Sequence, residues 1–150
     1  MDQLLNEMMN KIRLVIGLLL MTSMIACAEK NAKQTSMETP QGVEFTNVDA
    51  QGLKEALSSE KKMLLLDVRT PGEVSQGKIT SDAKVIDFYD EDFSERLKEL
   101  DKSMPIYVYC KAGGRSSSAA KMMVDQGFEK VYNLNGGVGG WVSAGYELSK

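Results

Sequence analysis

Residues 106–120 read IYVYCKAGGRSSSAA, and this stretch predicts a strand, a short loop and the start of a helix. The alternation of β-branched and aromatic side chains over residues 106–109 favours a buried strand. Cys110 follows at the end of that strand. A single cysteine is therefore expected where a strand, a loop and a helix N-terminus meet.

The loop after Cys110 predicts a reactive thiol. Gly113 and Gly114 allow the chain to curl so that successive N–H groups point inward, and Ser116 or Ser117 is expected to cap the helix. Such a nest of donors, with roughly half a positive charge from the helix N-terminus, favours an anion. It is expected to lower the pKa of the thiol from about 8.5 toward ~3.5–7.5. A buried structural cysteine is the commoner fate of a lone cysteine, but the glycine pair and the serines favour the reactive interpretation.

Two cations lie within this stretch, Lys111 and Arg115. Beside a thiolate they would attract an anionic substrate and stabilise the ionised sulfur. As solvated charges at the rim of a loop they would contribute little. We favour the functional interpretation for both.

Composition limits the class of protein. The 150 residues allow one domain with a sizeable core, and 43% hydrophobic and 26% charged residues are typical of a globular chain. A net charge of −3 without a basic cluster argues against nucleic-acid binding. The chain contains no His, which excludes His-based triads and most catalytic zinc sites. We expect no metal and no cofactor.

Several short motifs, taken in order from about Val43 to the C-terminus, resemble the single-domain rhodaneses, a family of sulfurtransferases. The motifs are Asp67-Val-Arg69, Gly77-Lys-Ile79, Cys110 to Ser116, Gly127-Phe128, Asn135-Gly-Gly137 and Gly140-Trp141. The resemblance implies a three-layer α/β/α domain with a mainly parallel sheet. It also implies that Cys110 is the nucleophile, that residues Lys111, Ala112, Gly113, Gly114, Arg115 and Ser116 bind substrate, and that Asp67 and Arg69 brace the active-site loop. Lys78 stands where many relatives carry His, a change expected to alter the surface rather than catalysis.

The hydrophobic pattern independently predicts an α/β domain, because strands alternate with helices. The expected strands cover residues 44–46, 63–66, 84–86, 106–109 and 131–134. The expected helix starts are Asp49, the capping box of Thr70 to Glu73, and the acidic cluster Asp90, Glu91 and Asp92, interpreted as a cap rather than a metal site. The helix after the cysteine loop is expected to stop at Gly127, and residues 136–140 to form a loop before Trp141.

The length of the loop distinguishes two reactions of a thiolate. Four residues lie between Cys110 and Arg115, whereas the cysteine-dependent phosphatases place five there. The smaller cradle suits an incoming sulfur atom and is tight for a tetrahedral phosphate. We therefore expect transfer of a sulfane sulfur from thiosulfate or a similar anion, through a Cys110 persulfide, to cyanide, a thiol or a protein. The alternatives are a phosphatase or arsenate reductase on a related scaffold, and a non-catalytic rhodanese-like binding module, a class that commonly loses its cysteine.

The first 27 residues resemble a bacterial lipoprotein signal. Basic residues at 11 and 13 precede an apolar run from Leu14 to about Ile25, too short for a membrane span. Residues 24–27 read MIAC, so Cys27 is the expected lipidation site. A plain signal peptide that leaves Cys27 free is the alternative. We expect a signal peptide at 1–26, a flexible linker at 28–42 and the rhodanese-like domain at 43–150, with translation starting at residue 1, 8 or 9.

This organisation predicts a protein of the cell envelope. Several acyl chains on Cys27 would anchor the domain to a bacterial membrane, on its periplasmic side or at the outer membrane. In an oxidising compartment Cys110 would then have no partner for an intramolecular disulfide and would stay available for chemistry.

Overall fold

A parallel sheet forms the centre of the part of the chain that the computed structural model describes, residues 44–59 and 62–150. The strands pair in the order β1-β5-β4-β2-β3, and all four pairings are parallel. The prediction of a mainly parallel sheet is therefore confirmed. The strands are β1 (Thr46–Val48), β2 (Leu64–Asp67), β3 (Lys84–Val85), β4 (Ile106–Tyr109) and β5 (Val131–Leu134).

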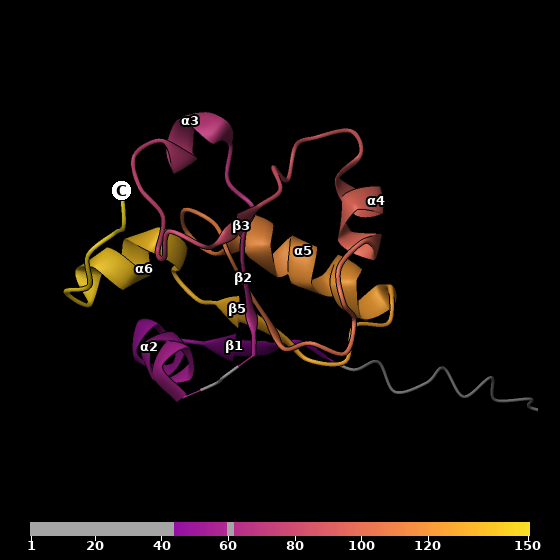
Figure 1. Ribbon diagram of the computed structural model, residues 1–150, viewed down its shortest axis with the longest axis horizontal. Helices are drawn as coiled ribbons and strands as arrows, with labels where there is room; N and C mark the ends of the chain where they lie inside the picture. Colours follow the sequence, from indigo (N-terminus) through magenta and orange to yellow (C-terminus); the bar gives the residue numbers. More distant parts are fainter. Residues whose placement is uncertain (1–43, 60–61) are drawn as a thin grey trace, which may run out of the picture. The chain divides into compact units, whose positions relative to one another are not determined.

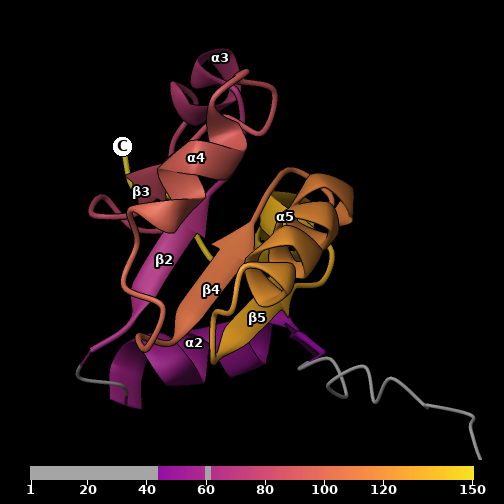
Figure 2. The ribbon, with the colours of Figure 1, turned by 90° about the vertical axis from the view of Figure 1, so that its right-hand side faces the viewer.

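Helices cover both faces of this sheet, which confirms the expected three-layer α/β/α architecture. One pair of helices, α2 and α6, lies to the left of the strands in Figure 1, and the other pair, α4 and α5, lies to their right. Figure 2 shows α4 and α5 in front of the strands. The helices are α2 (Ala50–Ser59), α3 (Pro71–Val74), α4 (Phe93–Lys98), α5 (Gly114–Asp125) and α6 (Gly137–Ser143).

The alternation of side chains along the central strand separates two hydrophobic cores. In β4, Ile106 and Val108 enter the core beneath α4 and α5, whereas Tyr107 and Tyr109 enter the core beneath α2 and α6. All four residues of this strand are buried. A strand covered on both faces is what the continuous run of apolar residues predicts.

Two of the expected helix starts are confirmed and one differs in its contacts. The Asp49 carboxylate accepts a hydrogen bond from the N–H of Gly52 at 2.8 Å, and Thr70 forms a complete capping box with Glu73. Asp92 stands at the N-cap of α4 but makes no side-chain capping bond there. The acidic cluster therefore lies at the start of α4, as expected, but without a side-chain capping hydrogen bond from Asp92.

Two predicted boundaries also differ. The first strand begins at Thr46, two residues after the expected start. The residues predicted as a glycine-rich loop instead begin α6, which starts at Gly137. Glycine has a low helix propensity, so the sequence pattern alone argues against a helix there.

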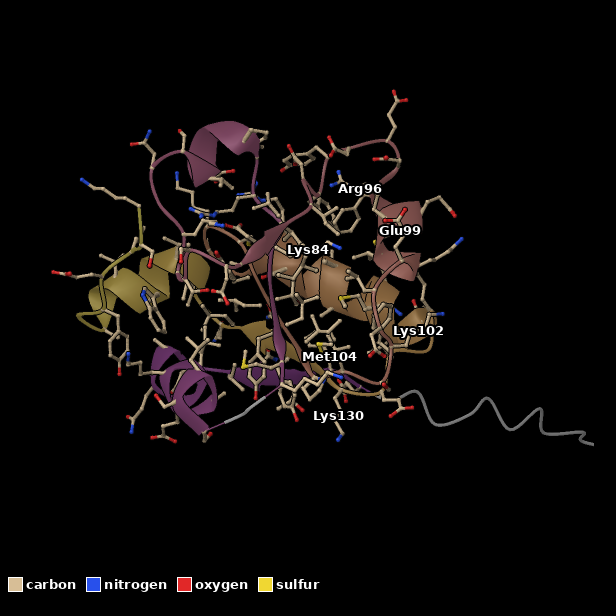
Figure 3. All side chains as sticks on the ribbon, viewed as in Figure 1. Lys84, Arg96, Glu99, Lys102, Met104 and Lys130 are labelled. Atoms are coloured by element: carbon tan, nitrogen blue, oxygen red, sulfur yellow. The ribbon has the colours of Figure 1, made fainter. Side chains whose placement is uncertain are left out.

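Lys102 connects the segment after α4 to the end of α5. Its Nζ donates a hydrogen bond to the carbonyl of Gln126 at 2.7 Å, and Gln126 is the C-cap of α5. Figure 3 shows Lys102 beside this end of the helix. A cation at a helix C-terminus stabilises the exposed carbonyls, so Lys102 stabilises the end of α5. Gly127 follows with a φ of +88°, as expected of a glycine that ends a helix.

The predictions for the N-terminal 43 residues, including the signal peptide and Cys27, fall outside the described residues. Within residues 44–59 and 62–150, none of the helices has the length and apolar character that a membrane crossing needs.

Candidate active site

Cys110 directly follows β4, at the carboxyl end of the central strand. The register of β2 against β4 pairs Asp67 with Tyr109. Asp67 therefore lies at the end of the neighbouring strand. Ligands of parallel α/β sheets bind beyond these strand ends, so the cysteine occupies the expected edge.

The Cys110 sulfur accepts hydrogen bonds from its own loop. The N–H of Gly113 lies 3.1 Å from Sγ, and the hydroxyl of Ser116 donates to Sγ at 3.5 Å. Cys110 is only 2% exposed, and this burial is the largest single influence on its pKa and raises it. The hydroxyl of Ser116 and the N–H groups of Ser116, Ala112 and Gly113 together outweigh burial and lower the pKa. Hydrogen bonds from the loop therefore favour the thiolate.

Ser116 acts differently from the predicted helix cap. The N-cap of α5 is Gly113, whose φ of +97° allows the chain to turn into the helix. Ser116 is fully buried in the first turn, and its hydroxyl contacts both the Gly113 carbonyl (3.1 Å) and the cysteine sulfur. The prediction that Ser116 or Ser117 caps the helix is wrong, because the glycine occupies that position.

Ser116→Ala is expected to move the alkylation of Cys110 to higher pH. Only the thiolate is alkylated, so the rate rises as pH increases through the pKa, and loss of a hydrogen-bond donor raises that pKa. The measurement is the rate of iodoacetamide labelling against pH. The control is Ser118→Ala in the same helix, where the serine is exposed and its hydroxyl bonds the Gly114 carbonyl. Identical pH profiles for the two variants would contradict the role of Ser116.

The first turn of α6 holds the cysteine loop from the other side. The N–H of Val138 donates to the Cys110 carbonyl at 2.8 Å, and the N–H of Gly139 donates to the Lys111 carbonyl at 3.0 Å. Gly137 packs so closely that a Cβ there would lie 2.3 Å from the Cys110 carbonyl oxygen. Sequence reasoning assigns these glycines to loop geometry and misses this contact. The density of glycines is the signal that two backbones meet here.

Arg115 forms an ion pair with Glu73 of α3. Its Nη1 and Nη2 donate to the two carboxylate oxygens at 2.7 and 2.8 Å, and its guanidinium lies 5.6 Å from the centre of the Tyr89 ring. Among the described residues, the hydrogen bonds of this side chain therefore go to Glu73 rather than to the Cys110 sulfur. Sequence reasoning identifies Glu73 only as part of a capping box and does not single out Tyr89.

Asp67 and Arg69 form a buried ion pair behind this site. Nε and Nη2 of Arg69 contact the Asp67 carboxylate at 2.6–3.0 Å, and the same guanidinium donates to the carbonyls of Gly77 at 2.8 Å and Glu73 at 3.3 Å. It also lies 5.5 Å from the ring centre of Tyr109. These bonds connect the end of β2 to α3 and the turn after it. Arg115 is part of the Cys110 to Ser116 motif, and Glu73 joins it to this pair, because the Glu73 carbonyl accepts from Arg69 and its carboxylate accepts from Arg115. Bracing of the loop by Asp67 and Arg69 stays a prediction.

The remaining predicted site residues line the outside of the loop. Lys111, Ala112 and Gly114 are exposed. Lys78 donates from Nζ to the carbonyls of Ser81 and Ala83 and so holds the turn before β3. Among the described residues, no group of three or more acidic, Cys or His side chains is placed to hold a metal ion.

Known proteins are similar to this chain in sequence and in fold. The family model described as Rhodanese-like domain matches residues 49–144. A sulfurtransferase of Allochromatium vinosum is 34% identical over 101 residues, which cover 67% of this chain and 92% of the relative. A putative sulfurtransferase of Bacillus subtilis is 30% identical over 99 residues, covering 66% of this chain and 92% of the relative.

Solved structures agree with the sequence relatives. The crystal structure of a rhodanese-like domain protein from Staphylococcus aureus has a TM-score of 0.60 at 25% identity and covers 71% of this chain and 100% of its own. The solution structure of a rhodanese-like domain from Anabaena sp. has a TM-score of 0.59 at 32% identity, covering 67% of this chain and 75% of its own. The strand-end cysteine, its loop of donors and these likenesses agree, and the chain belongs to the family of rhodanese-like domains.

Proposed function

We propose that this protein is a sulfurtransferase that moves a sulfane sulfur from a donor such as thiosulfate to a thiophilic acceptor through a persulfide on Cys110. The observation that carries the proposal is the set of N–H and O–H donors directed at Sγ. Gly113 and Ser116 supply the two direct hydrogen bonds. Relatives named as sulfurtransferases add support at the level of reaction class.

The reaction has two steps, as in other covalent catalysis by cysteine. The thiolate attacks the outer sulfur of the donor, and the remainder of the donor leaves with the electron pair of the broken S–S bond. The persulfide then occupies the loop, where the N–H groups that lower the pKa of Cys110 also stabilise the charge on the added sulfur. An acceptor, cyanide in the assay and a thiol or a protein in the cell, attacks this sulfur and restores the thiolate. Neither step requires a proton from a His side chain.

The test is the intact mass of the purified protein after treatment with thiosulfate. A gain of one sulfur atom, removed again by cyanide, is the expected result. No gain under conditions where iodoacetamide alkylates Cys110 would overturn the proposal, because the thiol would then be reactive but not a sulfur acceptor.

We also propose that Cys27 is lipidated and anchors the protein in the bacterial cell envelope. The motif MIAC after an apolar run supports this location. Metabolic labelling with a fatty-acid analogue is expected to mark the unaltered protein and to fail on Cys27→Ala. Equal labelling of both proteins would contradict the proposal.

A further inference from the structure

The carboxylate of Glu73 accepts hydrogen bonds from the guanidinium of Arg115, which follows the loop of the reactive cysteine. The bidentate contact joins α3 to α5, and both side chains are partly buried, at 27% exposed for Glu73 and 17% for Arg115. The Tyr89 ring contacts the same guanidinium and is itself 67% exposed. Arg115 therefore faces a carboxylate and an aromatic ring instead of standing as a free cation.

This ion pair lies within electrostatic reach of the reacting sulfur. The hydrogen bonds that Arg115 donates to Glu73 contribute most to raising the pKa of Arg115, and the negative charge of Cys110 contributes as well. Arg115 is in the first turn of α5, the helix whose N-terminal loop surrounds the sulfur. The net charge of the pair is therefore felt by an anion that approaches the thiolate.

Glu73 remains ionised at any pH near neutrality. The Arg115 side chain lowers its pKa to about 2, and the N–H and hydroxyl of Thr70 contribute in the same direction. The N–H and the hydroxyl of Thr70 donate to the Glu73 carboxylate at 3.2 and 3.0 Å, so the start of α3 fixes the carboxylate toward the arginine. The pair consequently carries no net charge under physiological conditions.

We propose that Glu73 is a specificity-determining residue that selects the sulfur donor by its charge. By neutralising Arg115, it reduces the attraction of a doubly charged donor such as thiosulfate relative to a singly charged alkyl persulfide. The physiological donor is then of the persulfide class. This inference rests on the proposed sulfurtransferase function and names the donor class of the same site.

Both donors would transfer their outer sulfur to Cys110 in the same kind of step. The Cys110 thiolate forms a new S–S bond to the outer sulfur as the S–S bond of the donor breaks. Thiosulfate releases sulfite, and an alkyl persulfide anion releases its thiolate, each with the electron pair of the broken bond. Before the reaction, thiosulfate carries one more negative charge than an alkyl persulfide anion. The net charge of the groups beside the thiolate therefore changes the approach of thiosulfate more than that of the persulfide.

The test compares single-turnover loading of Cys110 by thiosulfate and by hydroxyethyl persulfide, followed by intact mass, in the unaltered protein and in Glu73→Gln. The substitution keeps the size of the side chain and removes its charge. The ratio of the thiosulfate rate to the persulfide rate is expected to rise on the order of three- to tenfold at low salt. The increase is expected to shrink at high salt, because counterions screen partly exposed charges.

The matched control is Glu95→Gln. Glu95 pairs with Lys98 at 2.6 Å on the exposed surface of α4, so this variant removes the same charge from an ion pair outside the cysteine loop. Its donor ratio is expected to stay within about twofold of the unaltered protein. An equal effect of Glu73→Gln on both donors would assign Glu73 a merely structural role and overturn the inference, while the proposed function would stand.

A second measurement does not depend on the folding of a variant. In the unaltered protein, the ratio of the two loading rates is expected to change less than about twofold between low salt and about 0.5 M NaCl. A steep fall of the thiosulfate rate with salt would show an uncompensated cation at the site and overturn the inference. If neither donor loads Cys110, the proposed function fails and the inference fails with it.

Discussion

Cys110→Ser is expected to lower the formation of thiocyanate from thiosulfate and cyanide by at least about 1,000-fold, because the reaction loses its nucleophile. A serine hydroxyl stays protonated near neutral pH, and the chain contains no His to remove the proton. The hydrogen bonds that stabilise a thiolate are too weak to ionise an alcohol. The variant is also expected to gain no sulfur when treated with thiosulfate. The two measurements are steady-state thiocyanate formation and intact mass.

The substitution is conservative enough to isolate the chemistry. An oxygen at the position of Sγ still accepts hydrogen bonds from Gly113 and Ser116, so a melting temperature close to that of the unaltered protein is the control for folding. Thiocyanate formation that survives the change would remove Cys110 from the mechanism. Hydrolysis of an aryl phosphate that depends on Cys110 would instead favour the phosphatase alternative.

Gly137→Ala is expected to lower both the free energy of unfolding and the rate of sulfur transfer. The new Cβ would lie 2.3 Å from the Cys110 carbonyl oxygen, 2.8 Å from the Lys111 carbonyl carbon and 2.9 Å from the Ala112 nitrogen. These are backbone atoms, which cannot rotate away as a side chain can. The φ of +54° adds a cost for any residue with a Cβ. We expect a loss of about 2–4 kcal/mol in denaturant unfolding from the strain and the overpacking.

The loss of activity has the same geometric origin. The cysteine loop must move away from α6, which lengthens the hydrogen bonds from Val138 and Gly139 to the loop carbonyls. A displacement on the order of 1 Å at a reacting group can reduce the rate about 100-fold. The matched control is Gly139→Ala, two residues further along α6, where the nearest atom to a new Cβ is the Lys111 oxygen at 3.5 Å, an ordinary contact. Equal behaviour of the two variants would contradict this account of how the loop is positioned.

Hydrophobic periodicity predicts the layers of the fold because helices and strands each have a characteristic spacing of apolar residues along the chain. The apolar run at residues 63–66 and the alternation at residues 106–109 identify two strands covered on both faces, and the structure contains both. The capping box of Thr70 and Glu73 likewise depends on residues three positions apart and is present. Local rules fail at α6, because its glycines are required by contact with the cysteine loop, which is distant in the sequence. These glycines allow the backbone of α6 to approach the backbone of the cysteine loop. Helix propensities describe single residues in a helix and cannot predict such a contact.

In the candidate site, too, local contacts are predicted from the sequence and contacts between distant segments are not. The donors around Cys110 come from its own loop, so the sequence predicts a lowered pKa and the structure gives the same direction. The partner of Arg115 lies 42 residues earlier in the chain. No spacing rule connects Glu73 to Arg115, because their contact depends on how α3 packs beside α5. The sequence therefore predicts the nucleophile and not the charge balance around it.

The contact between α6 and the cysteine loop has a consequence for biosynthesis. The ribosome makes residues 137–139 after Cys110, so a nascent chain exposes the thiol before the amides that hold its carbonyl have been added. Until α6 forms, the carbonyls of Cys110 and Lys111 lack these two hydrogen-bond donors. We therefore expect the cysteine loop to reach its final geometry only when the later segment has folded against the earlier one.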